Sequence, residues 1–189
     1  MAYELRSARW LAADCQRAVI QPGDRVIDAT MGNGHDTLFL ARLVGDTGHV
    51  TAFDLQPDAV KSTAARLAEN GVADRCELHC LGHEHMAEIV TEPVRAVVFN
   101  LGWLPGGDKS VTTRWETTKR AVEAAMGLLL PGGVITICVY PGHEAGDIER
   151  RSLTEWLSQV RPQAFNILHQ RFLNAGPGAP ECVILQKMG

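Results

Sequence analysis

The chain has 189 residues, the usual size of one domain and enough for a continuous core around one sheet. Hydrophobic residues make up 46% and charged residues 21% of it, which excludes a largely disordered chain. The formal net charge of −4 argues against the strong basic footprint of tight non-specific nucleic-acid binders, although local cationic clusters leave RNA contacts open. We therefore expect one domain over residues 1–189.

Location and redox state follow from the apolar segments and the cysteines. No stretch approaches the roughly 20 apolar residues of a membrane helix. The N-terminal segment has no basic stretch followed by an uninterrupted apolar run, which is the pattern of a secretion signal. We expect a cytoplasmic protein with no membrane partner. The cysteines are odd in number, include no C-x-x-C pair and lie mostly in apolar segments, which predicts reduced core residues: Cys15, Cys76, Cys80, Cys138 and Cys182.

Predicted helices and strands alternate along the chain. Helical patterns, several of them ended by Pro or Gly signals such as Pro131-Gly132-Gly133, cover residues 11–20, 36–44, 57–70, 86–90, 115–130 and 147–160. Strand patterns cover residues 25–29, 49–54, 76–81, 96–100, 134–140, 165–172 and 181–187. This order predicts an α/β fold, a Rossmann-like, doubly wound, mostly parallel seven-stranded sheet with an antiparallel C-terminal hairpin.

Ligands of such sheets bind beyond the carboxyl ends of the strands, and a glycine-bearing turn follows the first strand there. Glycines let the backbone approach a nucleoside closely, although a purely structural turn has the same composition. The candidate cofactor-binding residues in and after this turn are Asp28, Thr30, Met31, Gly32, Asn33, Gly34, Asp36 and Thr37.

An acidic residue, Asp54, ends the second strand and precedes Leu55 and Gln56, two further cofactor candidates. A carboxylate in this position accepts hydrogen bonds from both ribose hydroxyls of a nucleoside. The dinucleotide fingerprint requires a third glycine where Thr37 stands, and the chain leaves little room for a separate substrate domain. The pattern favours S-adenosylmethionine over NAD as the cofactor.

His83 and Glu84 follow the third strand, where the adenine edge of a nucleoside would lie, and are also cofactor candidates. The triplet His83-Glu84-His85 invites comparison with a metal site. Neighbouring side chains there point in different directions, and no further ligand cluster is evident, so we expect no stable metal.

Two segments in one chain resemble a known family: Val26-Ile27-Asp28-Ala29-Thr30-Met31-Gly32-Asn33-Gly34-His35-Asp36-Thr37-Leu38-Phe39-Leu40-Ala41 and Asn100-Leu101-Gly102-Trp103-Leu104-Pro105-Gly106-Gly107-Asp108-Lys109. The chain resembles, from about Val19 to Lys187, the small bacterial class I methyltransferases labelled putative rRNA methylases, some of which methylate the aminomethyl group of the tRNA wobble uridine. The resemblance implies a single class I methyltransferase domain, S-adenosylmethionine as donor and a homodimer. Thr30 stands where the general class I pattern has glycine, so its contact stays open.

The segment Asn100-Leu101-Gly102-Trp103 has the spacing of the Asn/Asp-Pro-Pro-aromatic loop of amino-methylating enzymes, without its two prolines. An Asn carbonyl and a backbone carbonyl can accept hydrogen bonds from an amine and aim its lone pair at the methyl group, while an aromatic ring stacks a base. We therefore expect Asn100 to be catalytic, Asn100 and Leu101 to contact the cofactor, and Trp103 to contact the substrate.

An alkylamine with a pKa of about 10 must lose a proton before it attacks. Asp108, Tyr140 and His143 are the candidates to assist, and Lys109 and Arg114 are candidates to contact RNA phosphates. Each also has an ordinary structural interpretation, as a cap, a packing residue or a surface charge.

The leading hypothesis is N-methylation of an aminomethyl group on a tRNA wobble uridine, with tRNA or another RNA as partner. The alternatives are methylation of rRNA or of a small amine, and a cofactor-binding protein without turnover. A nicotinamide oxidoreductase is the least favoured.

Overall fold

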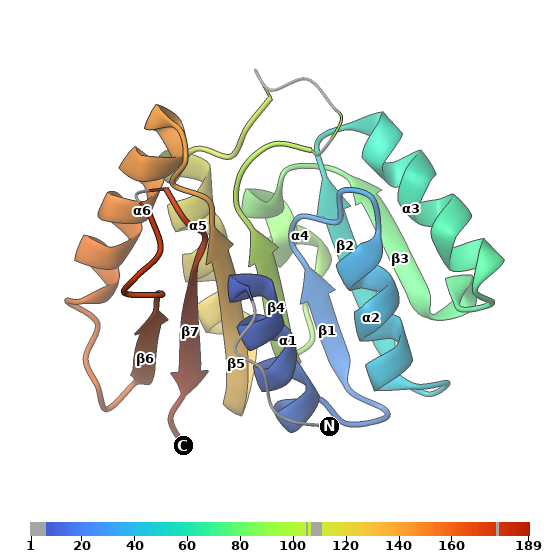
Figure 1. Cartoon of the computed structure of the whole chain (residues 1–189). Helices are drawn as coiled ribbons and strands as arrows, with labels where there is room; N and C mark the ends of the chain where they lie inside the picture. The colour runs from blue at the N-terminus through green and yellow to red at the C-terminus, as the bar shows by residue number, and fades with distance from the viewer. Residues whose placement is uncertain (1–6, 105, 107–110, 177) are drawn as a thin grey trace.

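One seven-stranded sheet organises the computed structural model, which describes residues 7–104, 106, 111–176 and 178–189 (Figure 1). The strand order is β3-β2-β1-β4-β5-β7-β6, parallel throughout except for β7, which is antiparallel to both β5 and β6. The sheet confirms the predicted fold class. The strands are β1 (Arg25–Asp28), β2 (His49–Asp54), β3 (Cys76–Cys80), β4 (Val94–Asn100), β5 (Leu129–Val139), β6 (Phe165–Gln170) and β7 (Glu181–Lys187).

Helices cover both faces of the sheet (Figure 1). On one face lie α1 (Ala8–Val19), α2 (His35–Val44) and α3 (Pro57–Glu69). On the other lie α4 (Met86–Ile89), α5 (Trp115–Leu128) and α6 (Glu144–Leu157), while the short 3-10 turns η1 (Ala73–Arg75) and η2 (His83–His85) flank β3. No helix of the described part of the chain is both long and apolar enough to cross a membrane.

The core consists of two apolar layers, one on each face of the sheet. Successive residues of β4 alternate between them: Val97 and Phe99 pack toward α5, and Ala96 and Val98 pack toward α2. Because both faces are covered, β4 is apolar at nearly every position, which is why its sequence reads as a continuous run.

The structure corrects the predicted boundary between α5 and β5. The helix ends at Leu128 and the strand begins at once, so Pro131-Gly132-Gly133 lie inside β5 and not in a turn before it. Pairing passes from Val94–Leu129 directly to Ala96–Val134, a bulge that tolerates proline because its residues leave the hydrogen-bond ladder.

The predicted burial of the cysteines is also only partly right. All five are free thiols, and Cys138 and Cys182 are buried opposite each other on β5 and β7 beneath α1. The prediction is wrong for Cys80, which is exposed because it ends β3, an edge strand covered on fewer sides than the central strands.

Candidate active site

A cavity of about 370 Å³ opens at the carboxyl ends of the parallel strands. Its walls come from the turn after β1, the end of β2, η2, the loop after β4 and the segment after β5. Most of the predicted site residues line it: Thr30, Met31, Gly32, Asn33, Asp36, Asp54, Leu55, Gln56, His83, Glu84, Asn100, Leu101, Trp103, Tyr140 and His143. Residues from five separate segments thus meet in one place, and their individual roles stay predictions.

The remaining predicted residues lie elsewhere. Asp28 and Thr37 are fully buried, and Thr37 Oγ1 donates a 2.7 Å hydrogen bond to Asp28 Oδ2. Asp28 Oδ1 accepts a hydrogen bond from the Thr30 backbone N–H at 3.2 Å. These two side chains therefore stabilise the turn from the buried side, away from the cavity. Arg114 is the N-cap residue of α5 and does not line the cavity, and Asp108 and Lys109 lie outside the described residues.

The glycine turn has a steric reason for its composition. Gly34 adopts φ +75°, and a Cβ there would lie 2.8 Å from both Cα and Oγ1 of Thr63 on α3. Thr63 Oγ1 also donates a 3.0 Å hydrogen bond to the Gly32 carbonyl, which ties the turn to α3. Gly34 therefore shapes the cavity without lining it.

We expect Gly34→Ala to destabilise the protein by about 2–4 kcal/mol, because backbone strain and overlap with the Thr63 backbone act together. Gly71→Ala is the matched control: Gly71 has φ +66° but open space around its Cβ position, so only strain of about 1 kcal/mol applies. Chemical denaturation of both variants measures the difference. Equal losses would show that the contact with Thr63 contributes nothing.

Asp54 presents both carboxylate oxygens at the junction of two turns. Oδ2 accepts the Gly32 backbone N–H and Oδ1 accepts the Gln56 backbone N–H, each at 3.0 Å. A carboxylate oxygen accepts more than one hydrogen bond, so capacity remains for a vicinal diol in the cavity. The adjoining Leu55 side chain is 63% exposed and offers apolar surface at the rim. Such a pairing of carboxylate and apolar rim suits a nucleoside.

His83 is a structural residue as well as a wall of the cavity. Only 7% of it is exposed, and its ring meets Phe99 edge-on at 5.7 Å between centroids. Burial lowers the pKa of His83, although a hydrogen bond with the Ala29 backbone opposes this, so the imidazole is neutral at pH 7. Among the described residues, no group of three or more metal-ligating side chains is gathered anywhere.

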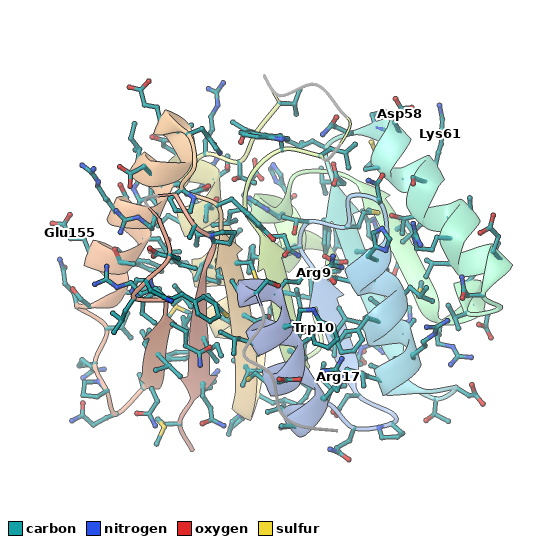
Figure 2. All side chains as sticks on the ribbon, viewed as in Figure 1. Arg9, Trp10, Arg17, Asp58, Lys61 and Glu155 are labelled. Atoms are coloured by element: carbon teal, nitrogen blue, oxygen red, sulfur yellow. The ribbon has the colours of Figure 1, made fainter. Side chains whose placement is uncertain are left out.

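Asn100 is oriented by a chain of polar contacts that begins on α1. Arg9 donates to Asp36 Oδ1 through Nε at 2.9 Å and also through Nη2, and Asp36 Oδ2 accepts from Asn100 Nδ2 at 2.7 Å. Figure 2 shows Arg9 near the carboxyl end of β1. Because one N–H of the amide donates to Asp36, the orientation of the amide is set, and its oxygen is available to accept from a ligand. Sequence reasoning missed Arg9, since nothing in its neighbours marks a site residue.

The loop after β4 is held at both ends. Trp103 forms an isolated β-bridge with Thr112, and the Thr113 backbone N–H donates to the Gly102 carbonyl at 3.1 Å. Thr113 Oγ1 donates to buried Glu149 on α6 at 2.7 Å, and burial raises the pKa of Glu149. Thr112 and Thr113 line the cavity, although their composition alone did not suggest it.

Two of the predicted proton acceptors also have structural roles. Burial raises the pKa of Tyr140 to about 12, so its phenol keeps its proton at neutral pH. His143 Nδ1 accepts the Gly146 backbone N–H at 3.1 Å as the cap of α6, which places the proton of the neutral ring on Nε2. Its ring packs against Trp103 at 4.3 Å between centroids, so both residues form an aromatic wall.

The family model described as Putative rRNA methylase matches residues 50–186, more than half of the chain. The chain belongs to this family. It is 39% identical to a putative rRNA methylase from Clostridium thermocellum, with a TM-score of 0.97 over 98% of this chain and 100% of that one. Membership confirms the predicted family and its class, the class I S-adenosylmethionine-dependent methyltransferases.

Two further relatives bear on cofactor and substrate. A putative methyltransferase from Streptococcus mutans, solved in complex with SAH, is 33% identical to this chain and has a TM-score of 0.90. The match covers 98% of this chain and 100% of that one. The chloroplastic tRNA (mnm(5)s(2)U34)-methyltransferase of Arabidopsis thaliana is 49% identical over 138 residues, 68% of this chain and 50% of that protein. The chain spans about half the length of the curated relatives that it matches.

Proposed function

We propose that the protein N-methylates the aminomethyl group of a tRNA wobble uridine with S-adenosylmethionine as the donor. The 49% identity to the Arabidopsis tRNA methyltransferase carries this proposal. The aromatic wall of Trp103 and His143 supports it, because aromatic rings that line the same cavity as Asn100 suit a nucleobase. The homodimer and the cytoplasmic location stay predictions.

The described residues fit the cofactor. Asp54 would hold the ribose hydroxyls, the backbone of the Gly32 turn would approach the amino-acid portion, and Leu55 with Glu84 would border the adenine. A Cβ on Gly32 would come within 3.4 Å of Leu104 and narrow this space. When bound, S-adenosylmethionine supplies an electrophilic methyl group on a positively charged sulfur.

Asn100 would position the acceptor amine. Its free amide oxygen accepts an N–H from the amine, which holds the nitrogen lone pair in one direction and stabilises the positive charge that develops on nitrogen. The hydrogen bond from Asn100 Nδ2 to Asp36 prevents the amide from rotating its nitrogen toward the substrate. Because the Asn100 side chain is already held in this orientation, no free energy is needed to reorient it in the transition state.

The test is nucleoside mass spectrometry of tRNA that carries the unmethylated aminomethyl uridine, before and after incubation with enzyme and S-adenosylmethionine. We expect a mass gain of one methyl group on that nucleoside and none on tRNA with an unmodified wobble uridine. Methylation of rRNA or of a small amine, with tRNA unchanged, would refute the proposed substrate while leaving the methyltransferase assignment intact.

A further inference from the structure

A second hollow, of about 700 Å³, lies beside the first between the start of α6 and the segment that joins β6 to β7. We infer that it binds the RNA backbone next to the methylated nucleotide. The inference rests on the proposed function, because it takes RNA as the substrate. The residues that carry it are His143, Arg150, Arg151, Arg171, Phe172 and Leu173.

The two hollows adjoin at one residue. His143 lines both, and its ring packs against Trp103 on the side of the first cavity. A nucleotide whose base lies along this aromatic wall must pass its sugar-phosphate backbone over the rim. The adjoining second hollow is within reach of the neighbouring nucleotide.

Three arginines line the second hollow, together with three carboxylates. Asp147 pairs with Arg150 at 2.8 Å and with Arg151 at 2.6 Å, and Glu181 pairs with His169 at 2.7 Å, while Glu144 also lines the space. A guanidinium has five N–H donors, so one shared carboxylate leaves several for a phosphate. Within the described residues Arg171 has no carboxylate partner, which makes it the strongest candidate for a phosphate contact.

Apolar side chains complete the surface. Leu173 is 90% exposed and follows the half-buried Phe172, directly after Arg171. Exposed apolar groups beside arginines suit a nucleotide, which presents a base and a sugar next to its phosphate. A protein partner would also use such a surface, but its position directly beside the cavity, with His143 shared, favours the substrate itself.

The test measures RNA affinity and methylation kinetics of Arg150→Gln/Arg171→Gln with a tRNA anticodon stem-loop. We expect the double variant to bind the RNA roughly tenfold more weakly, and the slope of log affinity against log salt to fall by about 1–2, since each phosphate contact releases counterions. The kcat at saturating RNA and the affinity for S-adenosylmethionine should stay at the parent values. Arg161→Gln is the matched control, because Arg161 is an exposed arginine before the start of β6, at the other end of that strand from the hollow.

The outcomes separate the two proposals. Parent-like RNA affinity and salt dependence in a folded double variant would overturn the docking surface alone. A changed sedimentation coefficient with unchanged RNA affinity would overturn it in favour of a contact between protein copies. A parent enzyme that methylates no RNA would overturn the proposed function and this inference together.

Discussion

Asn100→Ala is expected to lower kcat for methyl transfer by about 10²–10³-fold, the usual loss when one preorganised transition-state contact is removed. The variant should retain its fold and most of its affinity for S-adenosylmethionine. The backbone N–H of Asn100 still donates to Thr30 Oγ1 at 2.7 Å, Asp36 keeps its pairing with Arg9, and Asp54 is untouched.

Single-turnover kinetics with tRNA, together with an equilibrium titration of the cofactor, measures this prediction. Asn166→Ala is the matched control, because Asn166 is exposed on the edge strand β6 and should keep parent activity. Parent-like transfer by Asn100→Ala would remove Asn100 from the mechanism. Undetectable turnover of the parent with every RNA would instead favour a cofactor-binding protein without catalysis.

The stability of the protein is expected to fall as pH rises from about 4 to about 7, through Asp28. Complete burial is the main reason that the pKa of Asp28 rises from 3.8 to about 7, and nearby Asp36 adds to it. Between these pH values the unfolded chain has released this proton and the folded chain keeps it. The contribution of Asp28 is therefore fully present below pH 4 and is lost as pH rises through 7, at up to about 1.4 kcal/mol per pH unit.

Asp28→Asn removes this titration and keeps one oxygen, which can accept from the Thr30 backbone N–H, while its amide nitrogen can donate to Thr37 Oγ1. We expect the free energy of unfolding of the variant, relative to that of the parent, to rise steadily between pH 4 and about 7 and to level off above it. Denaturation curves at several pH values measure the gap. Asp58→Asn, a change of an exposed side chain on α3, is the control, and its free energy of unfolding should follow that of the parent at every pH. If the free energy of unfolding of Asp28→Asn also followed that of the parent, the prediction would be contradicted.

Short sequence patterns were sufficient to predict the fold because they reflect properties of single elements, such as the burial of a strand or the conformation of a turn. The β4 run is apolar because both faces of that strand are covered, and Gly34 occurs where an L-residue would be strained. The same reasoning misplaced the start of β5, since Pro131-Gly132-Gly133 has the composition of a turn whether it ends a helix or forms a bulge.

The candidate site was predictable in its position and less so in its roles. Asp54 and Asn100 end the parallel strands β2 and β4, one on each side of β1, so the strand order alone brings them to the same end of the sheet. Asp28 has the same placement, yet its side chain turns into the core. A strand end specifies where a residue lies but not which way its side chain points.

The sequence by itself determined the order of strands and helices, the glycine turn, the acid after β2 and the family, because these depend on periodicity, backbone sterics and short motifs. Only the tertiary structure decided that Arg9 orients Asn100 through Asp36, that burial shifts the pKa values of Asp28 and Tyr140, and that His143 lines both hollows. These properties arise from contacts between segments far apart in the chain and from exclusion of water, neither of which a local pattern records.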